Sequence, residues 1–568
     1  MIRSRVLAST LTFALLSGAS LPALAQQAAQ PAATTAPVAA STARAAPPLV
    51  VTIVVDQFSA NLFSQYRSRF TGGLKTLADQ GLVHVNGYQT HGLTETCPGH
   101  STILTGMHPT ETGILANDWV DPATGKEVYC LAAPQNTLAH GKNTDNGPVG
   151  PDQLMVSTLA DWLKEKNPQS RIFAVSGKDR GAINLNGHKG DGAYWFTDGF
   201  GLTTYVEPGQ SAEARLAPVA AFNARFRAMS EASNPAPYWT GAFSDCQGLD
   251  GDWTIRGQTF RAAVPPANPV FDTSPALDEA TLVAAADLLQ SQQLGRRGTT
   301  DMLGVSLSAT DRIGHSFGTQ GPEMCEQMHR LDAALGLFLN KLPEGTLVVL
   351  TADHGGSDFV ERLHDHGYPH AHRADLERVA RVNLALKERF NLEVNPLQQG
   401  GSGLMVAGRG GVALADPLRT EVANAAVEML KTNPEIAFVA TRDAVLTDPI
   451  PASDNPDMLT LRERARLSAV AGRSPDILIF YAQNVVPGGS VGRAISGHGT
   501  PFDYDRRVPI IFWTKGAEGL GQERFLPIRT LDIAPTLAHV MGVTAPKVEG
   551  RCIDLPGFAT GRCETVQP

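Results

Sequence analysis

The chain reads Leu49-Val-Val-Thr-Ile-Val-Val55 and then Asp56 at the point where its globular part begins. This run is short, rich in β-branched residues and apolar at consecutive positions, so we expect both of its faces to be buried. Strands buried on both faces are typical of a parallel sheet with helices on each side. The run therefore predicts a strand of such a sheet, ended by a carboxylate.

Further runs of this kind follow along the chain, and helical patterns alternate with them. We predict strands at 172–175, 302–307, 346–351, 475–480 and 508–513, and helices at 72–80, 154–166, 277–289 and 323–342. This alternation predicts an α/β doubly wound fold, in which a central, mostly parallel sheet is flanked by helices on both faces. In such sheets ligands bind at the carboxyl ends of the strands.

Residues 1–25 contain a basic, an apolar and a small-residue region in that order, which is typical of a secretory signal peptide cleaved after Ala25. An uncleaved anchor is the alternative, and the short apolar region disfavours it. We therefore expect a periplasmic or secreted protein. Cleavage removes two arginines and takes the net charge from −9 to −11. A mildly acidic chain argues against nucleic acid as a partner, and no internal apolar run reaches the roughly 20 residues that span a bilayer.

The remaining chain divides by composition. Residues 26–48 are rich in Ala and Pro and almost uncharged, so we expect a flexible leader. Residues 49–568 are predicted to form one domain with insertions near 197–264 and 391–460. The first insertion is either a cap over the site or surface elaboration. We expect a monomer.

Six cysteines allow 15 full pairings, so the sequence cannot choose among them. The short separation of the last two favours a disulfide between them, while buried free thiols remain an alternative. The six are Cys97, Cys130, Cys246, Cys325, Cys552 and Cys563.

Several segments combine the residue types that bind divalent metals. Asp311 and His315 share one face of a helical turn, Asp353 and His354 are adjacent at a strand end, and His498 lies among small residues. An Asp after a single strand is more often a helix cap or a turn residue. Here three of them follow strands, each beside His or in a Gly-rich context. Oxygen and nitrogen ligands without thiolate favour Zn²⁺ and leave Mn²⁺ or Co²⁺ open.

The hydroxyl of Thr96 precedes a Cys-Pro-Gly turn and is the candidate nucleophile, which a metal could activate. Ser101 and Thr102 are rival hydroxyls, for which helix capping and packing are the better interpretation.

Three residues are candidates for binding an anion. Lys178 and Arg180 follow a predicted strand and can reach a phosphoryl group from one side, and Asn117 can donate to a further oxygen. By themselves, such loop charges are usually solvated.

A second histidine cluster suggests either an extra metal site or a loop beside the active site, and we favour the loop. Its members are His364, His366, His370 and His372. We expect His100 to support the Thr96 turn without binding metal.

These motifs, in their order along the chain from Val50 to Arg551, resemble the alkaline phosphatase superfamily, and most closely its periplasmic PafA-type alkaline phosphatases. The motifs are Val-Val-Asp56-Gln, Thr96-Cys-Pro-Gly-His, Asn117-Asp-Trp, Lys178-Asp-Arg180-Gly-Ala, Asp311-x-x-Gly-His315, Thr-Ala-Asp353-His354-Gly and Gly-His498-Gly. The resemblance implies two zinc ions per chain. It assigns one to Asp311, His315 and His498, and the other to Asp56, Asp353, His354 and the oxygen of Thr96. It also implies that Asn117, Lys178 and Arg180 bind the phosphoryl oxygens, with Lys and Arg in place of a structural Mg²⁺.

The resemblance thus implies a phosphomonoesterase that acts on small-molecule phosphate esters through a phosphothreonine on Thr96 and releases inorganic phosphate. The main alternative is a phosphodiesterase or nucleotide pyrophosphatase of the same superfamily. A sulfatase would need a Cys-x-Pro-x-Arg pattern, which is absent around Cys97. A phosphoglycerate mutase is disfavoured by the signal peptide and by Thr in place of Ser. An exported metal-binding protein without turnover is the alternative outside the enzymes.

Overall fold

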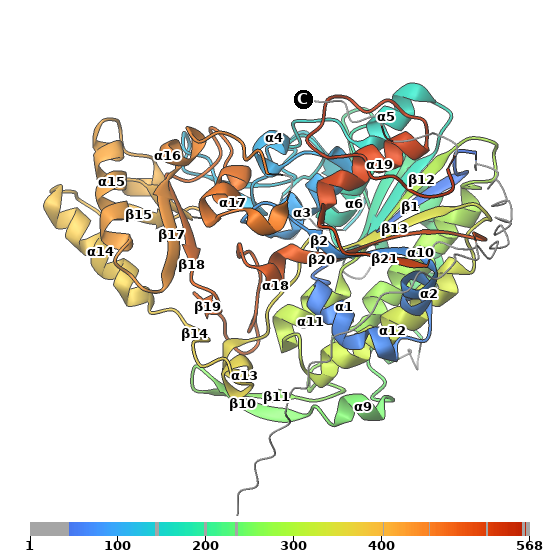
Figure 1. Cartoon of the computed structure of the whole chain (residues 1–568), viewed down its shortest axis with the longest axis horizontal. Helices are drawn as coiled ribbons and strands as arrows, with labels where there is room; N and C mark the ends of the chain where they lie inside the picture. The colour runs from blue at the N-terminus through green and yellow to red at the C-terminus, as the bar shows by residue number, and fades with distance from the viewer. Residues whose placement is uncertain are drawn as a thin grey trace, which may run out of the picture. The chain divides into compact units, whose positions relative to one another are not determined.

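The computed structural model describes residues 45–141, 147–197, 201–232, 237–401, 403–453, 455–517, 521–558 and 563. The predicted signal peptide and most of the predicted leader lie outside the described residues. The described chain is built around a ten-stranded mixed sheet (Figure 1), in which the strands follow the order β21-β2-β20-β13-β1-β12-β6-β7-β8. The edge strand β21 (Gln522–Arg524) and the short β22 (Ile528–Arg529) both pair with β2.

Strand β1 (Leu49–Val55) lies inside this sheet, and every one of its residues is buried. It pairs in parallel with β12 (Asp301–Leu307) on one side and with β13 (Leu347–Thr351) on the other. Beyond β12 the parallel order continues through β6 (Ile172–Ser176) and β7 (Gly192–Thr197). The apolar run at the start of the fold is thus the double-sided strand that its sequence predicts.

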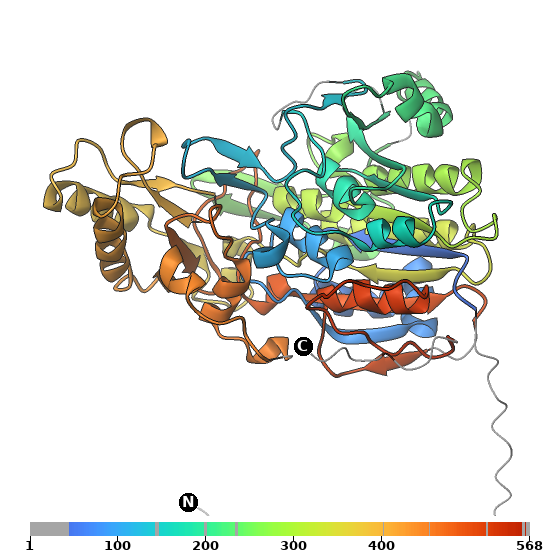
Figure 2. The same ribbon diagram turned by 90° about the horizontal axis from the view of Figure 1, so that it is seen from above.

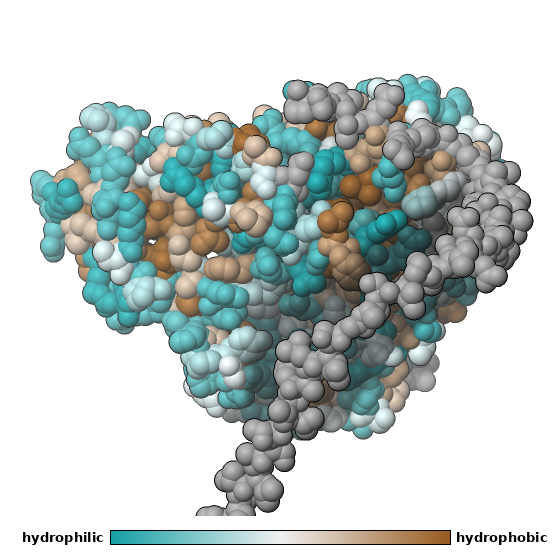
Figure 3. All heavy atoms as spheres, viewed as in Figure 1, coloured by the Kyte–Doolittle hydropathy of each residue, from teal (hydrophilic) through white to brown (hydrophobic). Residues whose placement is uncertain are grey.

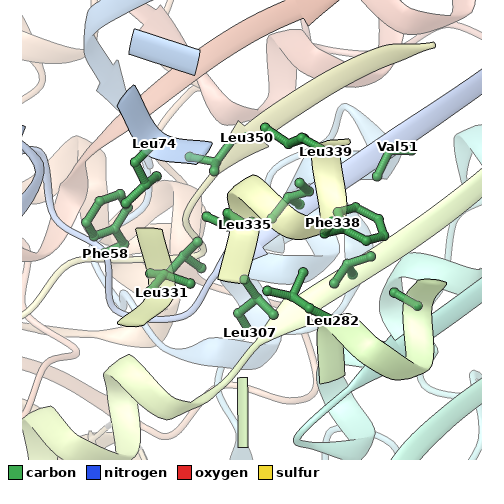
Figure 4. Close-up of a cluster of buried hydrophobic side chains, with 14 of the residues drawn as sticks. Val51, Phe58, Leu74, Leu282, Leu307, Leu331, Leu335, Phe338, Leu339 and Leu350 are labelled. Atoms are coloured by element: carbon green, nitrogen blue, oxygen red, sulfur yellow. The ribbon is translucent and has the colours of Figure 1, made fainter. Parts of the chain in front are cut away.

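Alternate residues of β1 bury against different helices. Val51 points to the face covered by α1 (Ala60–Tyr66), α2 (Gly73–Gln80), α10 (Pro275–Ser291) and α12 (Pro322–Leu339), where it shares a core with Leu74, Leu335 and Leu350 (Figure 4). Val50 and Val54 point to the other face, which is covered by α3 (Thr96–Thr105), α5 (Leu159–Lys166) and α19 (Ile533–Val540). The predicted α/β fold with helices on both faces is confirmed.

Two of the predicted strands take different places from those expected. The run at 508–513 forms β20 (Arg507–Thr514), which joins the central sheet but runs antiparallel to β13 and β2 (Leu82–Tyr88). The run at 475–480 forms β18 (Ile477–Tyr481), which belongs to a second sheet. An apolar run reports burial on both faces but carries no information on strand direction or partner.

The second sheet has four strands in the order β15-β16-β18-β17. Figures 1 and 2 show it, mostly in orange, beside the central sheet together with α14 (Leu376–Arg389) and α15 (Leu418–Leu430). Its strands are β15 (Leu397–Gln399), β16 (Gly403–Val406), β17 (Ile436–Thr441) and β18. With its own apolar core, this unit extends beyond the predicted insertion at 391–460 on both sides.

The predicted insertion at 197–264 is not one structural unit. Strand β8 (Gly201–Thr203) continues the central sheet, and α8 (Ala220–Ser230) contacts it. The hairpin of β10 (Gly251–Ile255) and β11 (Gln258–Ala262) packs on Ile495, three residues before His498, and Trp239 packs on Phe317, two residues after His315. Parts of this region therefore lie near the predicted site.

All six cysteines are paired, as Cys97–Cys130, Cys246–Cys325 and Cys552–Cys563. The favoured pairing of the last two is present, whereas the other two could not be chosen from sequence. Hydrophilic residues cover much of the face in Figure 3, with apolar residues in separate groups between them. Among the described helices, none combines the length and apolar character needed to cross a membrane.

Candidate metal centre

The predicted ligands lie where three neighbouring parallel strands end. Asp56 follows β1, and Asp353 with His354 follows β13. Helix α11 (Ala309–Phe317) follows β12 and carries Asp311 and His315 on successive turns. Because the carboxyl ends of parallel strands meet at one edge of a sheet, residues up to about 300 positions apart are brought together there.

The first group of ligand atoms comes from α11 and from the loop that carries His498. Asp311 Oδ1 lies 3.2 Å from His315 Nε2 and 3.4 Å from His498 Nε2. One ligand atom from each of the three residues lies within 4.8 Å of the others. This is the spacing of side chains that can share one ion.

The second group consists of Asp56, Asp353 and His354, all of them buried. His354 Nε2 lies 3.5 Å from Asp56 Oδ1 and 3.6 Å from Asp353 Oδ2. The hydroxyl of Thr96 lies 3.5 Å from the same nitrogen. The rings of His354 and His498 stack with centroids 3.7 Å apart, so the two groups adjoin each other and Thr96 belongs to the second.

All three imidazoles are oriented in the same way. Nδ1 of His315 donates to the carbonyl oxygen of Ser496, Nδ1 of His498 to that of Thr94, and Nδ1 of His354 to that of its neighbour Gly355. A carbonyl oxygen only accepts, so Nδ1 carries the proton in each ring. Each Nε2 is therefore turned toward the carboxylates, the arrangement by which metal-binding histidines are usually held.

The surroundings of His354 indicate that the second group can bind a cation. Burial lowers the pKa of His354 to about 3, so its ring is neutral and Nε2 presents a lone pair. That lone pair faces Asp56 Oδ1, which has no hydrogen-bond partner among the described residues. Two acceptors directed at each other in a buried site fit a shared cation. The donor set of carboxylate oxygens and imidazole nitrogens, without thiolate, suits Zn²⁺.

The charges of the carboxylates also favour a bound cation. Burial, together with the negative charges of Asp311 and Asp353, raises the pKa of Asp56 well above its usual range. Although burial opposes ionisation, His315 and Lys178 hold the pKa of Asp311 well below that range. The ammonium of Lys178 lies 2.6 Å from Asp56 Oδ2 and 2.5 Å from Asp311 Oδ2, between the two groups. The carboxylates thus concentrate negative charge that positive charge must balance.

Thr96 is the first residue of α3, where the free backbone N–H groups of a helix favour an anion. Asn117 is fixed beside it, because the Cys97 N–H donates to Asn117 Oδ1 over 2.9 Å and the Asn117 N–H donates to Glu95 Oε2 over 2.7 Å. Among the hydrogen bonds of the described residues, none uses the Asn117 amide nitrogen, so it can donate to a ligand. His100 Nδ1 lies 3.0 Å from the Thr96 carbonyl oxygen, in the supporting place expected from sequence.

The rival hydroxyls are occupied within α3. Ser101 donates to the carbonyl oxygen of Pro98 and Thr102 to that of Gly99. Both therefore play the structural part that their sequence position indicates.

Lys178 and Arg180 lie at the start of α6 (Asp179–Asn186), directly after β6. Tyr129 donates a 2.7 Å hydrogen bond to Asp179 Oδ1. Although burial opposes its charge, Tyr129, Asp179 and Asp56 raise the pKa of the Arg180 guanidinium, which stays charged. Tyr129 ends β4 (Glu127–Tyr129), which forms a hairpin with β3 (Asp118–Val120). This hairpin thus holds Arg180, a role for Tyr129 that the sequence did not indicate.

The structure places all ten predicted site residues around this one edge of the sheet, although Lys178 contacts carboxylates instead of standing apart as an anion ligand. It does not bring together the cluster of His364, His366, His370 and His372, which forms no group of three ligand atoms within 4.8 Å in the described chain. Two further groups found among the described residues each contain a disulfide pair, so their sulfur atoms are bonded to each other.

Comparison with known proteins gives consistent matches over most of the chain. Residues 50–480 match the family model described as type I phosphodiesterase/nucleotide pyrophosphatase. The chain is 38% identical over 541 residues to the alkaline phosphatase PhoK of a Sphingomonas species, covering 92% of this chain and 94% of PhoK. It is 36% identical over 529 residues to the alkaline phosphatase PhoD of Zymomonas mobilis, covering 91% and 89%. The crystal structure of wild-type alkaline phosphatase PafA superposes with a TM-score of 0.75 at 26% identity, covering 90% of this chain and 99% of that one.

Proposed function

The chain belongs to the type I phosphodiesterase/nucleotide pyrophosphatase family, within which it is an alkaline phosphatase of the PafA type, and from this premise we propose that Thr96 attacks phosphate monoesters at a site for two zinc ions. One observation carries the proposal most directly. The Thr96 hydroxyl and two carboxylates surround the bare Nε2 of His354, beside a second group built around Asp311.

We assign one zinc to Asp311, His315 and His498, and the other to Asp56, Asp353 and His354 with the oxygen of Thr96. When bound, the two ions supply Lewis-acid stabilisation of negatively charged oxygen and lower the pKa of an oxygen nucleophile. The three histidines are already turned for this by their Nδ1 hydrogen bonds.

The residues of the chain then carry the phosphoryl transfer. The oxygen of Thr96, after its proton has passed to water, forms a bond to phosphorus while the bond from phosphorus to the ester oxygen breaks. The ester oxygen takes a proton from water and leaves as the alcohol. Water then hydrolyses the phosphothreonine and releases inorganic phosphate. Asn117, Lys178 and Arg180 donate to the phosphoryl oxygens, where charge spreads in the transition state.

The hydrogen-bond donors of the site favour a phosphate monoester as substrate. The dianionic phosphoryl group of a monoester matches the two cationic side chains of Lys178 and Arg180 and the amide of Asn117. This is also the activity in the printed names of PhoK, PhoD and PafA. The family description keeps diesters as the competing substrate class. A comparison of aryl phosphate with bis-aryl phosphate decides between them: a diester turnover tenfold or more above the monoester turnover contradicts the assignment.

We further propose that the chain is exported, with residues 1–25 as its signal peptide. Pairing of all six cysteines supports this, because disulfides persist in oxidising compartments. Residues 49–568 then form the catalytic domain, in which the hairpin of β10 and β11 and the unit built around the second sheet are insertions.

The test is a matched pair of variants with metal analysis. We expect wild-type protein to hold two zinc ions and to lose activity in a chelator. Thr96→Ala keeps both ions but loses at least about 10³-fold in kcat, whereas Thr96→Ser keeps a nucleophile and much of the rate. A Thr96→Ala enzyme with intact metal and full activity would remove Thr96 from the mechanism.

A further inference from the structure

Gln57 directly follows the ligand Asp56 and is buried between the two ligand groups. Its backbone N–H donates to Asp353 Oδ1 over 3.2 Å. Its side-chain amide donates from Nε2 to Asp311 Oδ1 over 3.1 Å. One neutral residue therefore holds a carboxylate of each group, from the strand that runs between them.

The backbone of Gln57 lies in the left-handed region, with φ at +65°. Residues other than glycine are disfavoured in this region, and they adopt it only where the surrounding structure fixes the backbone. Glycine at this position would relieve the strain but would lose the amide. The strained backbone at Gln57 thus occurs together with the hydrogen bond that its side-chain amide donates to Asp311.

The two segments that flank the Gln57 side chain have glycine at positions close to it. A Cβ at Gly314, one residue before His315, would lie 1.7 Å from Gln57 Oε1. A Cβ at Gly356, two residues after His354, would lie 2.7 Å from Cγ and Cδ of Gln57. Both ligand segments therefore carry glycine where the Gln57 side chain passes between them.

Lys178 also spans the two groups, through Asp56 and Asp311. Its role differs because its ammonium carries a positive charge, which bound divalent cations repel. The Gln57 amide has no net charge, so its contacts are compatible with metals in both groups. Hydrogen bonds to ligating carboxylates fix their orientation and raise metal affinity.

We propose that Gln57 is a positioning residue that sets the separation of Asp311 from Asp353 and thereby secures retention of both metals. This inference rests on the proposed two-zinc function. It predicts that loss of the amide weakens zinc binding by about 10- to 100-fold, the usual effect of removing a hydrogen-bond partner of a metal ligand.

The experiment compares wild-type full-length enzyme with Gln57→Ala and Gln57→Gly. Zinc per chain and the rate of zinc transfer to a chromogenic chelator are measured, together with thermal unfolding. Asn391→Gly is the control, because Asn391 also has a positive φ, at +49°, but follows α14 in the second unit. It separates backbone relief from loss of the amide.

We expect Gln57→Gly to unfold at a higher temperature than Gln57→Ala, since glycine accepts the left-handed backbone. Both should nevertheless lose zinc at least tenfold faster than wild type, while Asn391→Gly keeps the wild-type rate. If Gln57→Gly retains both ions at the wild-type rate, the positioning role is wrong although the proposed function stands. If wild-type protein itself binds fewer than two divalent ions, both fail.

Discussion

Gly99 of α3, the helix that begins at Thr96, packs closely against the backbone of Asp353, so Gly99→Ala tests how closely nucleophile and ligand must be placed. A Cβ at Gly99 would lie 2.2 Å from the Asp353 carbonyl oxygen and 2.8 Å from its Cβ. Ordinary Cβ contacts begin at about 3.4 Å, so the two segments must separate by about 1 Å. Both segments carry residues of the second ligand group.

A misplacement of about 1 Å can lower catalysis by about 10²-fold, which corresponds to about 2.7 kcal/mol of transition-state stabilisation. Stability should suffer less than activity. Overpacking costs about 1–3 kcal/mol, whereas alanine within a helix is favoured over glycine by about 1 kcal/mol. We therefore expect a folded enzyme, less stable by about 0–2 kcal/mol, whose kcat/KM for an aryl phosphate falls about 100-fold.

Gly81→Ala is the matched control, because its Cβ would lie 2.4 Å from the carbonyl oxygen of Leu77, at the end of α2 and outside the site. It should destabilise the fold to a similar extent and leave kcat/KM within about twofold of wild type. Thermal unfolding, zinc content and steady-state kinetics are measured on both variants. A folded Gly99→Ala enzyme with bound zinc and kcat/KM within threefold of wild type would refute the reasoning.

Two further predictions concern groups outside the ligand set. Tyr129→Phe removes the hydrogen bond to Asp179 beside Arg180, so we expect kcat/KM to fall about three- to tenfold with zinc content unchanged; an unchanged kcat/KM contradicts this role. Glu323 is buried at the start of α12, and burial raises its pKa from 4.5 to about 7. Between these two pKa values the folded chain keeps the Glu323 proton, whereas the unfolded chain loses it. The contribution of Glu323 to the free energy of unfolding is therefore complete below pH 4.5 and lost as pH rises through 7. Between pH 5 and pH 8 the free energy of unfolding of wild type should therefore fall by up to about 3 kcal/mol relative to that of Glu323→Gln. Urea unfolding measures both proteins at both pH values. If their free energies of unfolding change equally, Glu323 does not titrate this way.

The position of the ligands was predictable because one rule connects sequence to space. Polar residues that follow strands buried on both faces meet at one edge of a parallel sheet, which brings together Asp56, Asp311 and Asp353 without further information. The partner and direction of a strand follow no such local rule. The run at 475–480 is short and ends in consecutive apolar residues, as β1 is, yet as β18 it pairs antiparallel with β16 and β17 in the second sheet.

The supporting residues were harder to predict, because their roles come from contacts made across the chain. Tyr129 contacts Asp179 from a separate hairpin, and nothing in the local sequence of Tyr129 indicates this. The signal for Gln57 lay in the sequence only indirectly, in Gly314 beside His315 and in Gly356 two residues after His354. Glycine is common in turns, so those positions had a simpler explanation until their distances to the amide were known.

The orienting hydrogen bonds link the ligand segments to one another. The carbonyl that orients His315 belongs to Ser496, in the loop that carries His498. The carbonyl that orients His498 belongs to Thr94, in the turn that carries Thr96. A shift of one segment therefore moves the partner of the next, and the glycine at 99 lets that same turn press against Asp353. Residues linked in this way act as a unit, so losses caused by substitutions in different segments are not expected to add.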